Sequence, residues 1–185
     1  MQANRVSDTL QFATNIGGAE SYGFEFELTA RPFQGLSLSV NGSINEAKVT
    51  DLTASEAAIS GATVGTRLAS PHFQGSATVR YDFALSPRAN GWAALNVSHV
   101  GSFPNQFPFI PGRPNVPAAT YDFTDAWTNV NLYAGTVIGD LNITAYVENL
   151  FDDSSITYVH PEAFLDARYA RLRPRTIGIR AGYAF

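Results

Sequence analysis

Apolar and polar residues alternate with a period of two along several stretches of this chain. Between residues 21 and 31 the apolar set is Tyr22, Phe24, Phe26, Leu28 and Ala30, and most residues between them are polar. Successive side chains of a β-strand point to opposite faces, so this alternation predicts a strand with one apolar and one polar face. A short turn, 32–35, separates it from a second alternating stretch, 36–45, and the two are expected to form a hairpin.

The same alternation recurs in five further stretches, at 72–83, 92–101, 127–138, 141–151 and 173–185. The chain therefore predicts seven strands, with a partial eighth before Asn15. The connections alternate between short turns and long loops, and the long loops are 46–70, 102–125 and 152–170. Short turns on one side and long loops on the other are typical of bacterial outer-membrane barrels. We expect an all-β, antiparallel up-and-down meander of seven or eight transmembrane strands.

The composition agrees with a β protein of low charge. Of the 185 residues 45% are hydrophobic and 15% charged, and the chain contains 13 Phe and 8 Tyr. The formal net charge of -4 argues against a nucleic-acid partner, which usually requires a basic surplus. The chain has no cysteine, which excludes disulfides and a thiol nucleophile.

Three segments resemble the carboxy-terminal barrel of TonB-dependent outer-membrane receptors. They are NIGGAESYGFEFEL near the start, VENLFDD at 147–153, and the ending RPRTIGIRAGYAF. The ending is similar to the strand signal that the barrel-assembly machinery reads, and Tyr183 and Phe185 would carry it. The resemblance implies a barrel of the 22-strand type whose lumen is blocked by a plug. It also implies energised uptake of a scarce ligand through TonB, the ligand being a ferric siderophore, a vitamin or a carbohydrate.

The chain departs from that family in its extent. It shows about a third of the strands, no plug, no TonB-contacting segment and no signal peptide, because no apolar run follows a basic start. We therefore expect residues 1–185 to be the carboxy-terminal portion of a longer receptor, located in the bacterial outer membrane, or the product of a truncated reading frame. Two alternatives remain: a complete small barrel of eight strands, and a soluble β-sandwich that acts as a binding module.

The long loop 102–125 is the candidate ligand-binding segment. It is rich in aromatic residues and prolines, which together favour a stiff, exposed apolar surface. The candidate ligand-binding residues are Phe103, Phe107, Phe109 and Tyr121. On the strands, the residues expected to face outer-membrane lipid are Phe73, Val79, Tyr81, Ile177, Ile179 and Tyr183.

Other reactive residues favour structural interpretations. His72, His99 and His160 are scattered, and His160 with Glu162 supplies only two ligands, so no metal and no cofactor is predicted. Glu25, Glu27 and Glu148 are the expected lining of a wet barrel interior, so catalysis is not predicted. The basic cluster Arg168, Arg171, Arg173 and Arg175 is expected to be solvated or paired with lumen carboxylates; an anionic lipopolysaccharide or ferric chelate is the alternative partner. The two aspartates of VENLFDD are expected to stabilise a turn.

Overall fold

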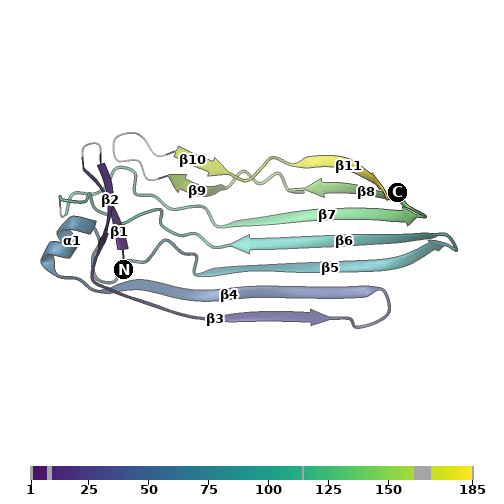
Figure 1. Ribbon diagram of the computed structural model, residues 1–185, viewed down its shortest axis with the longest axis horizontal. Coiled ribbons are helices and arrows are strands. Elements are labelled where there is room, and N and C mark those ends of the chain that lie inside the picture. Colours follow the sequence, from purple (N-terminus) through teal and green to yellow (C-terminus); the bar gives the residue numbers. More distant parts are fainter. Residues whose placement is uncertain (1, 8–9, 114, 161–167, 185) are drawn as a thin grey trace.

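The structure is a computed structural model that describes residues 2–7, 10–113, 115–160 and 168–184. Its main element is a seven-stranded antiparallel sheet in the order β11-β8-β7-β6-β5-β4-β3 (Figure 1). Its strands are β3 (Gly18–Ala30), β4 (Leu36–Asp51), β5 (Phe73–Ser86), β6 (Ala89–Val100), β7 (Trp127–Ile138), β8 (Leu141–Glu148) and β11 (Thr176–Tyr183). The predicted antiparallel meander is confirmed, with seven strands in the sheet.

Three smaller elements lie at the end of the sheet opposite the short turns (Figure 1). They are the hairpin of β1 (Gln2–Ser7) and β2 (Leu10–Asn15), the hairpin of β9 (Ile156–His160) and β10 (Arg168–Arg171), and the helix α1 (Ala54–Ser60). The partial eighth strand expected before Asn15 is thus a separate hairpin, not a member of the main sheet. Among the described residues, no helix is long and apolar enough to cross a membrane.

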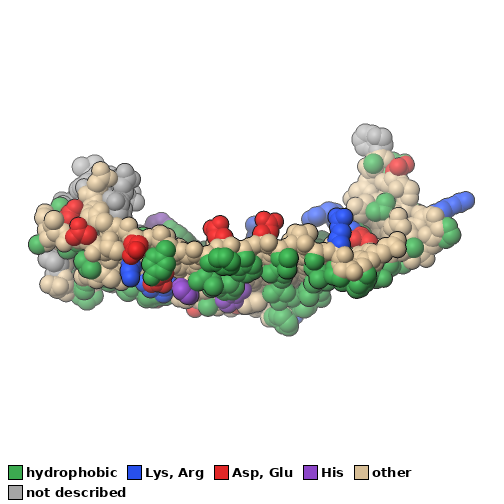
Figure 2. All heavy atoms as spheres, turned by 90° about the horizontal axis from the view of Figure 1, so that it is seen from below, with side chains coloured by type: hydrophobic (Ala, Val, Ile, Leu, Met, Phe, Trp, Pro, Cys, Tyr) green, Lys and Arg blue, Asp and Glu red, His purple; other side chains and the backbone are tan. Residues whose placement is uncertain are grey.

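The strand register gives the sheet two chemically different faces. Val79 has Leu38 and Leu95 as its cross-strand partners, whereas the neighbouring Thr78 has Ser39 and Asn96. We call the first side the apolar face and the second the polar face. Seen edge-on, hydrophobic side chains gather along one side of the sheet, and acidic and basic side chains project from the other (Figure 2).

Large hydrophobic side chains are exposed on the apolar face. The exposed fraction is 64% for Phe24, 74% for Ile177 and 77% for Ile179. The buried hydrophobic residues lie instead at the end of the sheet that carries the long loops: Ile16, Ala47, Val49, Ala62 and Val159. The packed core of the chain therefore lies at the loop end of the sheet, between the end of β4 and the connections, while the apolar face of the sheet is left open.

The expectation that 46–70 is a loop without regular structure is wrong. Strand β4 continues to Asp51, and beyond Ile44 its buried residues, Ala47 and Val49, share the parity of the polar face. Beyond Ile44, the apolar residues of β4 lie on the opposite face of the strand from those before it, because that opposite face is the one that is buried there. The helix α1 follows, and it begins with a capping box in which Thr53 and Glu56 exchange hydrogen bonds.

The third expected loop, 152–170, also contains regular structure. Strands β9 and β10 pair within it, from Ile156↔Arg171 to His160↔Arg168. The buried Val159 lies on this hairpin and anchors it. The remaining loop, 102–125, contains no strand of the main sheet, as predicted.

Candidate functional site

A row of amide and hydroxyl side chains crosses the polar face. Asn96 Nδ2 donates to Thr78 Oγ1 at 3.0 Å, and Asn131 Nδ2 donates to Asn96 Oδ1 at 3.3 Å. The row continues to the end of β8, where the Asn149 backbone N–H donates to Asn131 Oδ1 at 2.9 Å. A face built from mutually hydrogen-bonded polar groups is suited to water rather than to a packed core.

An open hollow of about 570 Å³ lies over β3, β4, β5 and β6. Its lining includes Glu25, Glu27, Asn41, Ser43, Gln74 and Ser98. Both glutamates are exposed, and neither forms an ion pair with a described basic residue. Their surroundings are those of solvated carboxylates, which agrees with the predicted wet lining.

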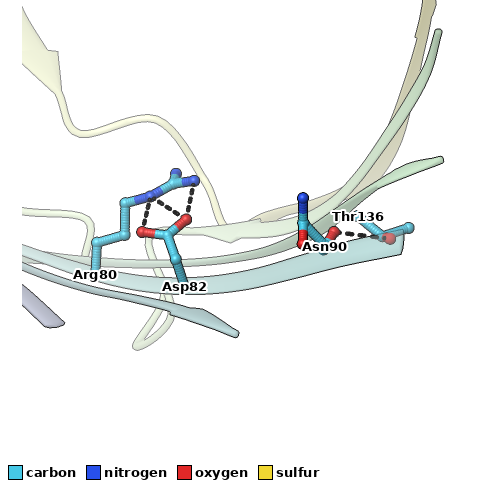
Figure 3. A network of polar contacts seen from close by, with 4 residues as sticks. All are labelled: Arg80, Asp82, Asn90 and Thr136. Carbon is cyan, nitrogen blue, oxygen red and sulfur yellow. Dashed lines mark hydrogen bonds and ion pairs between the residues drawn. The ribbon is translucent and has the colours of Figure 1, made fainter. Parts of the chain in front are cut away.

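Nearer the short turns, the polar face carries an arginine held between two partners. Arg80 makes a bidentate contact with Asp82, the shortest N···O distance being 2.7 Å, and its guanidinium lies 4.2 Å from the centre of the Trp92 ring. Figure 3 shows the Arg80 and Asp82 side chains, with Asn90 and Thr136 on the adjoining strands β6 and β7. The Thr136 hydroxyl donates to the Asn90 carbonyl oxygen at 3.0 Å.

The long loops are joined to one another at the end of the sheet opposite the short turns (Figure 1). Loop 102–125 is tied to α1 because the Gly112 N–H donates to the Ala58 carbonyl at 2.7 Å, and the Phe109 N–H donates to the Gly61 carbonyl at 3.1 Å. We call α1, residues 102–125, β9 and β10 together the loop layer.

The other side of the loop layer is joined by Asp122 and Asp125. The Asp125 N–H donates to the Ile156 carbonyl at 2.9 Å, and the Ile156 N–H donates back to Asp125 Oδ2 at 2.7 Å. The Tyr169 hydroxyl donates to Asp122 Oδ2 at 3.1 Å. Loop 102–125 is therefore held on both flanks, by the helix and by the β9–β10 hairpin.

Glu56 connects the loop layer to the start of the chain. Its Oε2 accepts hydrogen bonds from the hydroxyl and the N–H of Thr53, and its Oε1 accepts one from the Gly17 N–H at 2.8 Å. These hydrogen bonds, those from Thr53 first, lower the pKa of the Glu56 carboxyl below its ordinary value. A charged Glu56 thus holds Gly17, the residue before β3, beside α1.

The four candidate ligand-binding residues lie on loop 102–125, where all of them are half-buried: Phe103, Phe107, Phe109 and Tyr121. The structure brings them into one folded segment, but it does not show the exposed aromatic surface that we expected. Among the described residues of this loop, the exposed large hydrophobic side chains are Val116 and Phe123, with 44% and 41% of their surface accessible. Phe123 packs edge-to-face on Tyr121, with ring centres 5.6 Å apart.

The VENLFDD segment makes a hydrogen-bonded junction between β8 and the last strand. Asp152 Oδ1 accepts the Arg175 N–H, and Asp153 Oδ1 accepts the Ser155 N–H, each at 2.8 Å. The hydrogen bonds of Ser155 lower the pKa of the Asp153 carboxyl. Asp153 therefore stabilises a turn, as the sequence predicted, whereas the Asp152 side chain joins this segment to the start of the last strand. Asn149, which the sequence analysis did not single out, is buried at the centre of this junction.

Two arginines of the basic cluster, Arg171 and Arg175, contact backbone carbonyl groups. Arg171 donates to the Ser154 carbonyl at 2.8 Å, and Arg175 donates to the Leu150 carbonyl at 3.3 Å. These contacts tie the segment before β11 to the VENLFDD junction. Arg168 and Arg173 lie in the same region and are exposed.

The histidines do not converge. His72 Nδ1 lies 3.2 Å from Glu46 Oε2, His99 Nδ1 lies 2.8 Å from Thr128 Oγ1, and the His160 ring packs edge-to-face on Tyr158. No group of three potential metal ligands is found within the described part of the chain. Glu162, considered as a second ligand beside His160, lies outside the described residues.

The candidate lipid-facing residues all lie on the apolar face of the sheet, with exposed fractions from 37% upward: Phe73, Val79, Tyr81, Ile177, Ile179 and Tyr183. Of the two residues expected to carry the assembly signal, Tyr183 ends β11 on this face. Phe185 lies outside the described residues.

Comparison with known proteins agrees with this geometry. A family model described as TonB dependent receptor-like, beta-barrel, matches residues 2–150. The ferric yersiniabactin uptake receptor FyuA from Yersinia pestis aligns over 92% of this chain and 24% of its own, with a TM-score of 0.70 and 22% identity. The siderophore receptor PiuA from Acinetobacter baumannii aligns over 97% and 23%, with a TM-score of 0.62 and 12% identity. No curated protein matches the chain. The present chain spans about a quarter of the length of either receptor structure.

Proposed function

The chain belongs to the TonB-dependent receptor-like β-barrel family, and we propose that it forms part of the wall of an outer-membrane receptor that takes up a scarce ligand. The observation that supports this most is the division of the sheet into an open apolar face and a polar face. An exposed apolar sheet face of this extent is unstable in water and stable against lipid, whereas a polar face lines a wet lumen.

The length of the apolar bands supports a membrane-spanning role. On β4, β6 and β7 the apolar face carries no charge over nine residues, at 36–44, 89–97 and 130–138. A tilted strand needs about 9 to 11 residues to cross the hydrocarbon core. On the loop side, the first polar residues of the apolar face after these bands are Glu46, His99 and Thr128. They mark the proposed boundary of the membrane.

The two edges of the sheet support a place in a larger barrel. The outer edges of β3 and β11 have no strand partner among the described residues. An unpaired edge in hydrocarbon leaves backbone groups without hydrogen bonds, so both edges need further strands. We assign residues 1–185 to the carboxy-terminal portion of such a barrel, with the plug and the TonB contact supplied by the rest of the receptor. Tyr183 and Phe185 would be read by the assembly machinery.

The proposed ligand class is a ferric siderophore. The two receptors of similar fold are described as a ferric yersiniabactin uptake receptor and a siderophore receptor. The chain supplies scaffold and loop surface for transport. A vitamin or a carbohydrate is the alternative cargo.

An immunoblot of membrane fractions tests the proposal. An antibody against residues 163–185 should detect an outer-membrane band several times larger than 20.0 kDa that changes mobility when the sample is boiled. A heat-shifting band near 20.0 kDa would instead indicate a complete small barrel. A band confined to the soluble fraction would contradict the membrane assignment and favour a soluble β-sandwich.

A further inference from the structure

Strand β4 differs from the other strands of the main sheet on its polar face. Its residues on this face are short and uncharged over 37–45: Ser37, Ser39, Asn41, Ser43 and Asn45. Each of the six other strands carries a charged or aromatic side chain on the same face: Glu25 on β3, Arg80 on β5, Trp92 on β6, Tyr133 on β7, Tyr146 on β8 and Arg180 on β11. Within the described sheet, β4 alone is therefore lined by small neutral groups over the height of its apolar band, 36–44.

The adjoining part of β5 widens this surface, because three of its residues are short, neutral register partners of the β4 set. We call the eight residues together the neutral lane: Ser37, Ser39, Asn41, Ser43, Asn45, Gln74, Ser76 and Thr78. The open hollow of about 570 Å³ lies over its middle, where Asn41, Ser43, Gln74 and Ser76 line it. The neutral lane is thus recessed and open on the polar side of the sheet.

Toward β11 the polar face is occupied by large side chains that are held in place. The Trp92 ring lies across Gly135 on the next strand, where a Cβ would come within 2.7 Å of it, and the Tyr146 ring covers Gly178 on β11. Arginines lie over both rings, 4.2 Å from the ring centre at Trp92 and 5.7 Å at Tyr146. This side of the wall offers bulk and charge, whereas the neutral lane offers neither.

The chemistry of the neutral lane suits a solute in motion. Movement through a pore requires contacts that are weak and repeated, because one strong contact would hold the solute in place. A neutral hydrogen bond contributes only about 1 kcal/mol net, and one to a charged group contributes about twice that. Groups on one face of a strand recur about every 7 Å, so a solute can reach the next before it leaves the last. Hydroxyl and amide groups also offer both donors and acceptors.

We propose that the neutral lane is the surface along which a ferric chelate passes the wall of the lumen. The proposal rests on the proposed function above, and it adds the route and the chemistry of contact. Carbonyl and amide groups on the outside of the chelate would exchange hydrogen bonds with the serines and asparagines of β4. The large side chains between β6 and β11 would border the route and limit its width.

Narrowing the neutral lane tests the route. Ser39 and Ser43 are half-buried and make no side-chain hydrogen bond within the described part of the chain, so Ser39→Trp and Ser43→Trp add bulk without removing a contact. The probe is radioactive iron loaded onto siderophores collected from the culture medium of the source cell. In cells producing the whole receptor, each variant should lower the uptake rate about tenfold. Binding of the probe to protonophore-treated cells should be unchanged.

The matched control is Thr176→Trp, which adds the same ring at an exposed hydroxyl residue of the polar face on β11. Its uptake rate should stay within about twofold of the native rate. Native uptake rates in the β4 variants, or an equal loss in Thr176→Trp, would overturn the route. Loss of surface binding together with uptake would make the neutral lane part of a binding site, which also overturns it.

The plug is the competing occupant of this surface. If Ser39→Trp displaced the plug, the cells would become sensitive to vancomycin, and the route would be overturned. A native receptor that takes up no siderophore iron would contradict the proposed function itself, and the route would fall with it. Normal native uptake with unaffected β4 variants would contradict the route alone.

A smaller substitution serves if the tryptophan variants do not assemble. Ser39→Cys introduces a single thiol into a chain that contains no cysteine. Reaction with a bulky methanethiosulfonate should slow uptake, and reaction with the methyl reagent should not, relative to the native receptor treated in the same way. Equal uptake after both reactions would overturn the route.

Discussion

Asn149 Nδ2 lies 2.7 Å from the carbonyl oxygen of Arg173 and donates a hydrogen bond to it. The same amide group donates to the Asp153 carbonyl and accepts from the Asp153 N–H, and Asn149 is only 4% exposed. One side chain thus joins the end of β8 to the segment that enters β11. The segment before β11 is therefore held beside the end of β8 just before the strand pairing between β8 and β11 begins.

Replacing Asn149 by alanine should destabilise the barrel wall. The substitution removes three part-buried hydrogen bonds to backbone groups of Asp153 and Arg173, at a cost of about 3 kcal/mol in total. The heat-shifted band on a gel should then appear at a lower temperature than in the native protein. Asn142→Ala is the control, because Asn142 is exposed on β8 and its side chain makes no hydrogen bond within the described part of the chain. Equal transition temperatures for Asn149→Ala and the native protein would contradict the role of the junction.

The two faces of β5 should differ in their tolerance of charge. Val79→Arg places a guanidinium on the apolar face near mid-strand, where lipid contact costs about 2 to 4 kcal/mol. Thr78→Arg places the same group on the polar face. We expect Val79→Arg to reduce the amount of assembled protein in outer-membrane fractions and Thr78→Arg to leave it nearly unchanged. Equal assembly of both variants would show that the facing is wrong.

Gly61 should be intolerant of a side chain because of its position against loop 102–125. Its φ is +72°, and a Cβ there would lie 2.0 Å from the Phe109 carbonyl oxygen. Gly65 has φ +87° with nothing within 4 Å, so Gly65→Ala carries the same backbone strain of about 1 kcal/mol without the clash. Chymotrypsin should cleave after Phe109 severalfold faster in Gly61→Ala than in Gly65→Ala. Similar cleavage rates would argue against tight contact between α1 and the loop.

The attachment of the chain start to α1 should depend on pH. The pKa of Glu56 lies below its ordinary value of 4.5 in the folded protein, so the folded state binds a proton less readily than the unfolded one. The stabilisation is therefore present above pH 4.5 and is lost as the pH falls through the lower, folded pKa. Hydrogen exchange of the Gly17 and Thr53 amides, corrected for intrinsic rates, should accelerate over that range. In Glu56→Gln the corrected rates should not depend on pH; a dependence equal to the native one would assign the effect to another group.

The aromatic residues of loop 102–125 stay candidates for ligand contact. Replacing Phe107 and Phe109 by alanine in the complete receptor should reduce uptake of radioactive iron from siderophore-containing medium by removing apolar contact surface. Phe33→Ala is the control, because Phe33 is an exposed aromatic residue on the short turn at the opposite end. Unchanged uptake with normal surface abundance would exclude these two rings from the binding surface.

The strands of the sheet could be predicted because the residue pattern that specifies each strand is local in the sequence. A period of two over each strand specifies which residues face which side, and the observed partners of Val79 and Thr78 follow from it. The short turns predicted the hairpin pairs β3–β4, β5–β6 and β7–β8 for the same reason. The side on which the long loops lie followed from their lengths alone.

The loop layer was less predictable because its contacts are non-local. The start of α1 has a recognisable capping signal, Thr53 three residues before Glu56. The sequence analysis did not identify the helix because α1 is short. Beyond Ile44 the apolar residues of β4, Ala47 and Val49, lie at alternate positions on the opposite face. In the sequence, this change of face looks like the end of the strand. The hydrogen bonds from Gly112 to Ala58 and from Tyr169 to Asp122 join distant segments, and no spacing in the sequence specifies them.

The location of the packed core at the loop end of the sheet separates the stability of this protein into two parts. Val49 and Val159 are buried by other protein residues, so urea, which solvates apolar and peptide groups, should weaken the loop layer directly. In the proposed membrane location the exposed Ile177 and Ile179 contact hydrocarbon, so the sheet should respond chiefly to the chain length of the surrounding detergent. The loops can therefore unfold and refold while the barrel wall stays in place.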